Sequence, residues 1–292
     1  MPSTLARYSP AAGVKVTPRQ AQWNFPADVP RHWFDSSPLL TAILDAFTLA
    51  IPDNERYYIR VLQRCMDRLG DPKQRNELAN FIRQEALHGV AHKAYWQHLQ
   101  QDGVQVSRFV GAVSTVLYKW LEPLIPQRLH VAIVSAIEHV NAYTGHIFLS
   151  RQLLRNADPR LRHLFEWHFA EEIEHKAVAF DVLDAVYPGY GTRMAGAATA
   201  LPVVYAELIS GTVWLLACRG ELLHWRTLRD LYQLMVGKGV LRNMLHYTWR
   251  YVQPSFHPWE DDDYELAKAV LESFDGKPLP ISTTGVGIET LS

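Results

Sequence analysis

A repeated arrangement of Glu and His constrains the fold of this chain more than any other feature of its sequence. Twice, a lone Glu is followed after 30 to 34 residues by a Glu-x-x-His motif. The six residues are Glu55, Glu85, His88, Glu138, Glu172 and His175. A separation of this length is typical of a helical hairpin, in which the chain turns and runs back beside itself. The repeat therefore predicts two similar helical hairpins.

The rest of the sequence favours an all-α fold. Apolar residues recur at helical spacing along 53–69, and no segment alternates with period two for long enough to predict a sheet. The other predicted helices, marked by caps, Gly and Pro, span 36–51, 73–100, 106–154 (with breaks at Pro123 and Pro126), 160–186, 194–218, 221–236, 240–251 and 262–274.

Composition places the chain among globular proteins, because 48% of its 292 residues are hydrophobic and 20% are charged. Residues 1–35 are rich in Pro and lack a helical period, so an extended arm is expected there. Residues 36–275 are expected to form a single all-helical domain, and 276–292 a loose tail. The net charge is −1, with basic residues spread among acidic ones, which argues against a nucleic-acid partner.

The repeated motif is also a predicted metal site. Residues three apart on a helix lie on one side of it, so each Glu-x-x-His can hold one ion. Four carboxylates and two imidazoles from four helices are the ligand set of two-metal sites in ferritin-like bundles. Oxygen and imidazole ligands without a thiolate suit iron or manganese, with zinc as an alternative. We therefore expect a ferritin-like four-helix bundle with additional C-terminal helices, and two iron ions as its cofactor.

Residues near the motifs are candidates for further roles. His168 lies seven residues before His175, a helical rise of about 10.5 Å. It would become a seventh ligand if a π-bulge bent the helix, and otherwise would contact a ligand without binding metal. Glu174 is expected to face water. A third motif, Glu221 with His224, has no repeat and is predicted to be unrelated to the metal site. The candidates for contacts that support the ligands are His92, Glu171, Tyr143 and Asp181.

A cytoplasmic protein is expected, because the N-terminus has no apolar core of signal-peptide length. Cys65 and Cys218 are too few for a disulfide framework and fit a reducing compartment. Residues 194–218 form a long apolar run, but Pro202 and Glu207 argue against a simple membrane span. We expect a buried or interface helix there, with membrane-surface association as the alternative. A homodimer is considered only because such dimers are common.

Several segments resemble one bacterial family. They are QEALHGVAH, AIEHVNAYTGH, WHFAEEIEHKAVAFDVL and YVQPSFHPWEDDD. Together they resemble the family of predicted metal-dependent hydrolases, over about residues 34–274. The site alone is similar to the seven-ligand di-iron site of p-aminobenzoate N-oxygenases, which activate O₂. The residues that carry this second resemblance are Glu55, Glu85, His88, Glu138, His168, Glu172 and His175.

Two enzymatic functions follow from the predicted site. The first expectation is an O₂-activating di-iron oxidase or oxygenase, which would need an electron donor and act on a small, partly apolar substrate. The alternative is a hydrolase in which two metals lower the pKa of a bound water. The chain has neither His-Glu-x-x-His nor Gly-x-Ser-x-Gly, so other familiar hydrolase motifs are missing. A non-catalytic metal-binding protein is the least supported alternative.

Overall fold

All the secondary-structure elements in the described part of the chain are helices, with no strand among them, which confirms the predicted all-α class. The computed structural model describes residues 14–20, 23, 25, 28–237 and 240–273. The tail expected at 276–292 lies outside the described residues. The α-helices are α1 (Pro38–Gln63), α2 (Pro72–Gln101), α3 (Val106–Ser114), α4 (Gln127–Ser150), α5 (Pro159–His175), α6 (Val178–Val186), α7 (Tyr190–Cys218), α8 (Trp225–Tyr232), α9 (Val240–Tyr251) and α10 (Tyr264–Ser273).

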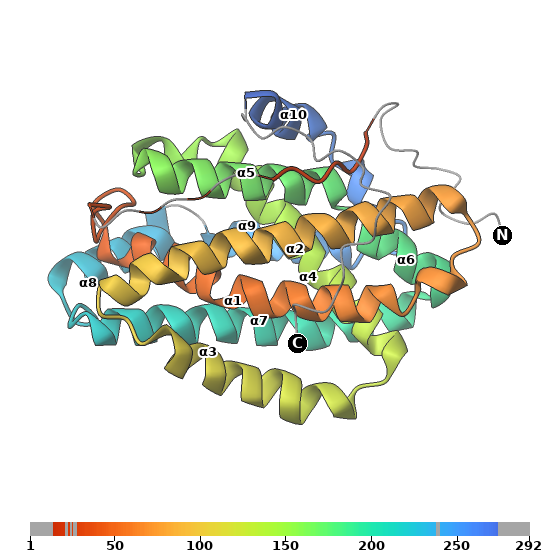
Figure 1. Ribbon diagram of the computed structural model, residues 1–292, viewed down its shortest axis with the longest axis horizontal. Coiled ribbons are helices and arrows are strands. Elements are labelled where there is room, and N and C mark those ends of the chain that lie inside the picture. The colour runs from red at the N-terminus through yellow and green to blue at the C-terminus, as the bar shows by residue number, and fades with distance from the viewer. Residues whose placement is uncertain (1–13, 21–22, 24, 26–27, 238–239, 274–292) are drawn as a thin grey trace.

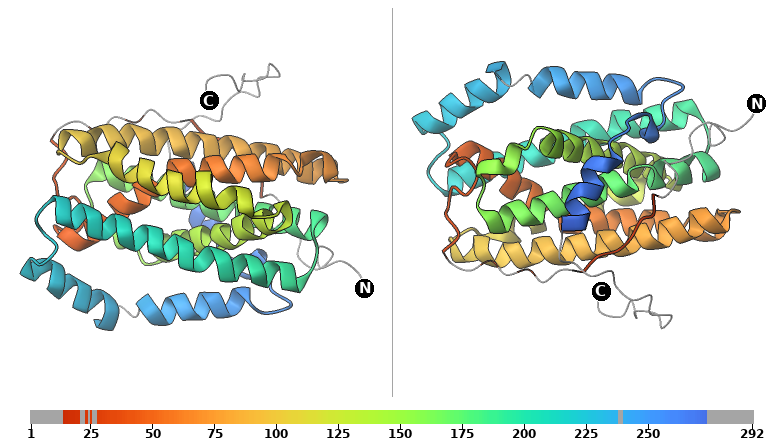
Figure 2. Two further views of the ribbon diagram at one scale, coloured as in Figure 1. Left: turned by 90° about the horizontal axis from the view of Figure 1, so that it is seen from below. Right: turned by 90° about the horizontal axis from the view of Figure 1, so that it is seen from above.

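Two hairpins carry the repeated Glu and His residues. Helices α1 and α2 pack along each other as the first hairpin, and α4 and α5 as the second (Figure 1). Helix α7 packs against both α1 and α4, while α8 and α9 run along one outer edge of the molecule (Figure 2). This arrangement is compatible with the expected four-helix bundle, to which α7 adds a fifth long helix.

Three of the four site helices begin with the same local signal, a capping side chain followed by Pro. The side chains of Ser37, Asp71 and Asp158 accept a backbone N–H in the first turns of α1, α2 and α5. In each case Pro occupies the first helical position, where its missing N–H costs nothing and its fixed φ suits the helix. These signals fix where each site helix starts, and so where its Glu and His residues lie.

The predicted break before Pro52 is wrong, since α1 continues through it to Gln63. A proline inside a helix leaves the carbonyl four residues earlier without its usual donor. Here that carbonyl belongs to Thr48, and Trp96 Nε1 donates to it at 2.9 Å. The indole therefore satisfies the group that Pro52 leaves open, and Glu55 lies within a continuous helix.

Other helix boundaries agree only in part with the prediction. The region 106–154 breaks near Pro123 and Pro126 as expected, into α3, the π-helix η3 (Thr115–Leu121), the short η4 (Glu122–Leu124) and α4. The helix predicted at 160–186 is instead two helices, because α5 ends at His175 and α6 begins at Val178. The helix predicted at 221–236 begins later, as α8, and continues as the π-helix η6 (Gln233–Gly237).

Helix α7 contains the apolar run. It is long and apolar enough to cross a membrane by length and composition, with 28% of its most apolar 18-residue window buried. Its inner side packs on α1 and α4, where Gly196 meets the backbone of Ala132 and the buried Glu207 accepts a hydrogen bond from Asn54 Nδ2 at 3.1 Å. This packing is compatible with the expected interface helix of a soluble bundle.

The described part of the N-terminal arm lies against the bundle. Phe25, Val29, Trp33 and Phe34 are each at most 8% exposed and belong to its apolar core. The described part of the arm therefore contributes to the core.

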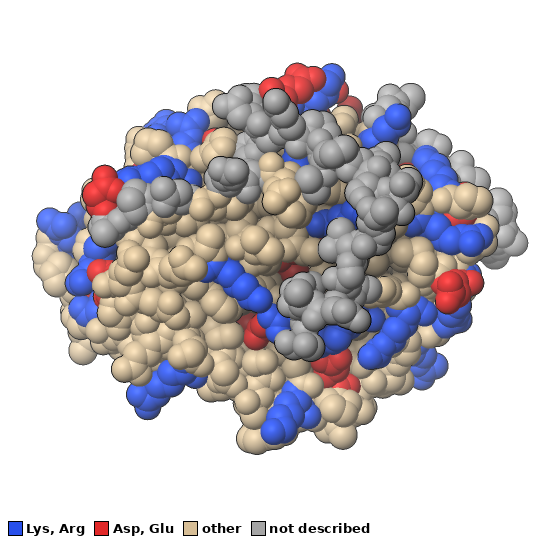
Figure 3. All heavy atoms as spheres, in the orientation of Figure 1, with Lys and Arg blue, Asp and Glu red and all other residues tan. Residues whose placement is uncertain are grey.

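On the molecular face drawn in Figure 3, charged side chains are scattered around a broad area of uncharged residues.

Candidate metal centre

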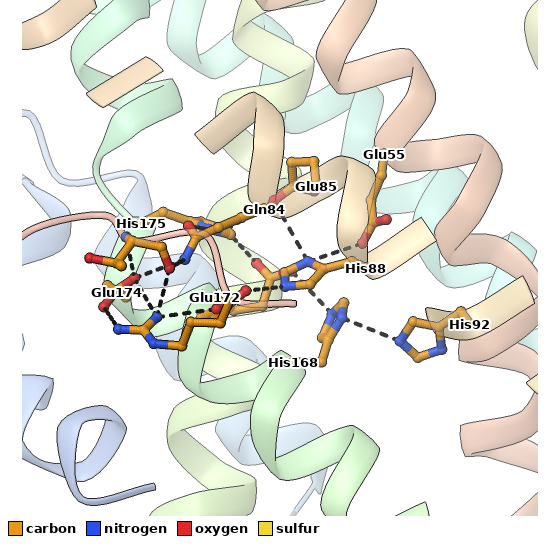
Figure 4. Close-up of polar contacts among 12 residues, drawn as sticks. Glu55, Gln84, Glu85, His88, His92, His168, Glu172, Glu174 and His175 are labelled. Atoms are coloured by element: carbon orange, nitrogen blue, oxygen red, sulfur yellow. Dashed lines mark hydrogen bonds and ion pairs between the residues drawn. The ribbon is translucent and has the colours of Figure 1, made fainter. Parts of the chain in front are cut away.

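The structure brings together all seven residues that were predicted to bind metal. Helix α1 supplies one of them, α2 two, α4 one and α5 three (Figure 4). They are Glu55, Glu85, His88, Glu138, His168, Glu172 and His175, and each is at most 1% exposed. Their role as ligands remains a prediction, and we refer to them below as the Glu/His cluster.

One half of the Glu/His cluster consists of Glu55, His88, His168 and Glu172. Each offers one ligand atom, and these atoms all lie within 4.8 Å of one another. His88 Nδ1 is 3.4 Å from Glu55 Oε1, and His168 Nε2 is 3.1 Å from Glu172 Oε1. Two atoms bound at right angles to one ion, at about 2.1 Å each, lie about 3 Å apart. The spacing therefore suits ligands around a single ion.

The other half consists of Glu85, Glu172 and His175, which form a second group within 4.8 Å. His175 Nε2 lies 3.3 Å from Glu85 Oε1, 3.1 Å from Glu172 Oε2 and 3.1 Å from Glu138 Oε2. Glu172 thus points one oxygen at each half of the cluster. A carboxylate in this position can bridge two ions.

Each of the three imidazoles is held by a partner on its outer nitrogen. His88 Nε2 donates to Glu171 Oε2 at 3.1 Å, and His175 Nδ1 donates to Gln84 Oε1 at 3.0 Å. His168 Nδ1 lies 3.3 Å from His92 Nε2. The nitrogen left over on each ring faces the cluster. Metal-binding histidines are oriented in this way, because the outer hydrogen bond fixes both the tautomer and the ring.

Many polar atoms of the cluster have no hydrogen-bond partner, and bound metal ions would give them one. Within the described residues, eight buried side-chain atoms of the cluster form no hydrogen bond. They are both carboxylate oxygens of Glu55 and Glu85, one oxygen each of Glu138 and Glu172, His88 Nδ1 and His168 Nε2. Burying such groups without partners costs several kcal/mol each. The residues present therefore fit a pair of metal ions.

The titration behaviour of the cluster follows from its burial. Burial and neighbouring carboxylates raise the pKa of Glu55 and of Glu85 well above the ordinary value. Burial lowers the pKa of His88 to about 3. Burial also opposes the charge on His175, but the carboxylates of Glu172 and Glu138 raise its pKa to about 10. Without metal the cluster holds protons, which a bound cation would displace.

His168 lies in the cluster although helix α5 has no π-bulge. Helix α5 is a regular α-helix from Pro159 to His175. The premise that only a bulge could bring His168 to the site is wrong, because it assumed that His168 and His175 must reach the same point. Instead they belong to different halves of the cluster, and Glu172, between them on the same helix, links the two.

A buried ionic layer, which the sequence did not predict, lies behind the imidazoles. Arg19 of the N-terminal arm forms ion pairs with Glu171 at 3.1 Å and with Glu174 at 2.9 Å. Gln84 Nε2 also donates to Glu174 Oε2 at 2.8 Å. The expectation that Glu174 faces water is therefore wrong, since Arg19 compensates its buried charge. Contact between the arm and α5 spans some 150 residues of chain and has no local sequence signal.

The remaining candidates lie outside the cluster. Asp181 pairs with His257 at 3.1 Å, and the Tyr143 ring stacks on Tyr247; in the described chain neither forms a hydrogen bond with the cluster. Of the unrepeated motif, Glu221 pairs with His32 at 2.7 Å and His224 caps the start of α8. That motif forms no part of the metal-ligand groups found among the described residues.

Fold and site together define an all-α protein with a buried carboxylate–imidazole cluster suited to metal. The chain belongs to the family described as predicted metal-dependent hydrolases, whose match covers residues 17–262. This confirms the family resemblance seen in the sequence. No curated protein and no solved structure shows a significant match.

Proposed function

We propose that the protein is an enzyme with two metal ions in the Glu/His cluster, and that iron in this centre activates O₂ for an oxidase or oxygenase reaction. The observation that carries the proposal is the pair of ligand groups linked by Glu172, with His168 as a seventh candidate ligand. A carboxylate-rich pair of sites between facing helices is typical of di-iron and di-manganese proteins. When bound, two irons would supply O₂ binding and the electrons that reduce it.

The side chains around the centre would hold the ligands in place and exclude water. His88 meets the ring of Trp167 edge-on at 4.8 Å, and His175 meets Phe81 at 4.8 Å. His168 meets Phe47 at 5.4 Å in the same manner. Because these rings surround the imidazoles, each imidazole can present only its inner nitrogen to a metal.

Burial of the centre favours a small co-substrate. The seven candidate ligands are at most 1% exposed. O₂ can reach such a centre with less movement of side chains than an ester or an amide, whose carbonyl must touch the metal. A sizeable organic substrate would instead bind beside the centre.

Metal-dependent hydrolysis is the second candidate, and the family description supports it more directly than it supports oxidation. For that reaction two bound metals would supply an activated water for attack on a carbonyl or phosphoryl group. Glu171, whose pKa burial raises to about 7 despite the opposing effect of Arg19, could exchange a proton near His88. Zinc or manganese would serve this chemistry as well as iron.

Metal loading followed by exposure to O₂ separates these functions. We expect the purified protein to bind two Fe(II) per chain without air, and then to consume O₂ with a new optical absorption band. Protein loaded with two irons that neither consumes O₂ nor changes its spectrum would refute the oxygenase proposal. Turnover of esters or amides by the zinc form would support the hydrolase instead.

The ligand assignment needs its own test. Glu172→Gln should prevent binding of two metals, because Glu172 belongs to both ligand groups. Glu221→Gln is the matched control, since Glu221 lies in the unrepeated motif and pairs with His32. If Glu172→Gln still binds two metals per chain, the assignment is wrong.

A further inference from the structure

Helix α8 and the π-helix η6 that follows it turn most of their apolar side chains outward, with Leu234 packed against the core as the exception. The exposed residues are Trp225 (59%), Leu228 (49%), Leu231 (44%), Tyr232 (67%), Met235 (48%) and Val236 (65%). Their spacing of three, four and seven residues places them along one side of the helix. An amphipathic helix of a soluble domain normally turns this side toward the core.

The inner side of α8 is polar. Thr227 is 3% exposed, and its hydroxyl donates to the Glu221 backbone carbonyl at 2.8 Å. Asp230 is 6% exposed and accepts a hydrogen bond from the Ser37 hydroxyl at 2.6 Å. Ser37, which caps α1, thus also holds α8 in place through Asp230. These buried bonds fix the orientation of α8, so its apolar side faces outward because its polar side is held inward.

Neighbouring residues extend this apolar surface. Leu223, just before α8, is 82% exposed, and Leu245 and Trp249, one turn apart on α9, are 63% and 65% exposed. Figure 2 shows α8 and α9 along the same outer edge of the molecule. We call the outward residues of α8, η6 and α9, together with Leu223, the α8–α9 face.

The exposed charges of this segment are cationic. Arg226, Arg229 and Arg242 are exposed, and the first two lie over the Trp225 ring at 5.7 and 5.2 Å. The two acidic residues in 221–250 are turned inward: Asp230 is buried and pairs with Arg229 at 2.7 Å, and Glu221 is half-buried and paired with His32. A surface that approaches the α8–α9 face therefore meets apolar and aromatic groups flanked by positive charge.

We propose that the α8–α9 face binds the surface of an anionic lipid bilayer. Trp and Tyr are enriched at the membrane–water interface, and an interfacial helix buries its apolar side there while Lys and Arg contact anionic headgroups. This places the membrane contact on α8 and α9 instead of on residues 194–218, and it needs no spanning helix. The inference does not depend on the proposed chemistry of the Glu/His cluster.

A second copy of the chain fits this face less well. In a two-fold dimer the same patch meets itself, so Arg226 and Arg229 would lie near their own copies. Asp230 already pairs with Arg229, and no exposed acidic side chain in the described part of 221–250 is available to pair with Arg226. Anionic headgroups offer the complementary charge that a second copy lacks.

Vesicle flotation with the full chain tests the proposal. We expect the protein to float with vesicles of phosphatidylglycerol and phosphatidylcholine, and to bind pure phosphatidylcholine at least tenfold more weakly. Salt at 1 M should weaken the binding to the anionic vesicles, because it screens the contribution of the Arg residues. Absence of binding to anionic vesicles would overturn the proposal.

Matched variants locate the contact. The double variant Trp225→Ser/Tyr232→Ser should bind anionic vesicles at least tenfold more weakly, with an unchanged circular dichroism spectrum and melting temperature. Val90→Ser should bind like the parent chain; Val90 is 61% exposed on α2, at the opposite edge of the molecule (Figure 2). Equal binding by the double variant would overturn the proposal. So would a dimer of the parent chain that the double variant converts to monomer.

Discussion

Arg19 connects the N-terminal arm to the candidate metal centre, and its removal gives a sharp test of the buried ionic layer. Its side chain is 14% exposed, and the carboxylates of its partners Glu171 and Glu174 are fully buried. Arg19→Met keeps most of the side-chain volume but leaves two buried carboxylates without their cation. Removing one partner of a buried ion pair typically costs about 3–5 kcal/mol, whereas an exposed pair contributes about 0–1 kcal/mol.

We therefore expect Arg19→Met to lower the free energy of unfolding of the metal-free protein by about 3 kcal/mol at pH 8. The matched control is Arg31→Met, whose lost ion pair with Asp102 involves a half-exposed Arg. Its loss should stay below about 1 kcal/mol. Urea denaturation followed by circular dichroism measures both variants on the same scale.

The loss should also depend on pH. Burial raises the pKa of Glu171 to about 7 even with Arg19 opposing this, so without Arg19 it should rise further. A carboxyl whose folded pKa is raised contributes stability below its unfolded pKa, and this contribution is lost as pH rises through the folded value. The effect of Arg19→Met should thus be smaller at pH 5.5 than at pH 8. Equal losses for Arg19→Met and Arg31→Met, or a loss independent of pH, would refute this reasoning.

Two further predictions concern the cluster and the docking of α7. Between pH 7 and 9 the metal-free protein should lose stability, because the pKa of His175, raised to about 10, keeps a proton on the folded chain that the unfolded chain has released. Thermal melts should show this fall with EDTA and not with two metals bound. Gly196→Ala should destabilise by about 1–3 kcal/mol, because its Cβ would lie 2.5 Å from the backbone of Ala132 on α4. The Cβ added by Gly191→Ala on the same helix meets nothing within 4 Å, so this variant should stabilise the protein by about 0.5–1 kcal/mol. Equal urea midpoints for the two variants would contradict the described packing of α7.

The Glu/His cluster could be predicted from the sequence because its geometry is mostly local. Each Glu-x-x-His pair is one turn of helix, and the hairpin length determines which Glu on the preceding helix lies opposite. Pro at the first position of α1, α2 and α5, after a capping side chain, marks where those helices begin. Spacing and caps were therefore sufficient to predict that six of these residues meet, whereas for His168 the spacing alone argued against it.

The features that the sequence did not predict depend on contacts between distant segments. A proline such as Pro52 is typical of a helix end. Helix α1 continues through it because Trp96 on the next helix donates to the Thr48 carbonyl, a contact that the local sequence does not indicate. The partners of Glu174 are Gln84 on α2 and Arg19 in the arm, so its own helix gives no hint of burial. Periodicity likewise predicts that α8 is amphipathic, but only the bond from Ser37 to Asp230 determines which side faces inward.

Charge explains why so polar a cluster can be buried between apolar helices. Its four carboxylates are Glu55, Glu85, Glu138 and Glu172, and its three imidazoles are neutral when they bind metal. Four negative charges are balanced by two divalent cations, whereas one cation would leave two charges uncompensated at a site that is at most 1% exposed. Without metal, burial raises the pKa of Glu55 and of Glu85, and the carboxylates of Glu172 and Glu138 raise the pKa of His175 to about 10 against the effect of its burial. Protons and two divalent cations would thus meet the same physical need, which is to compensate the negative charge of buried carboxylates.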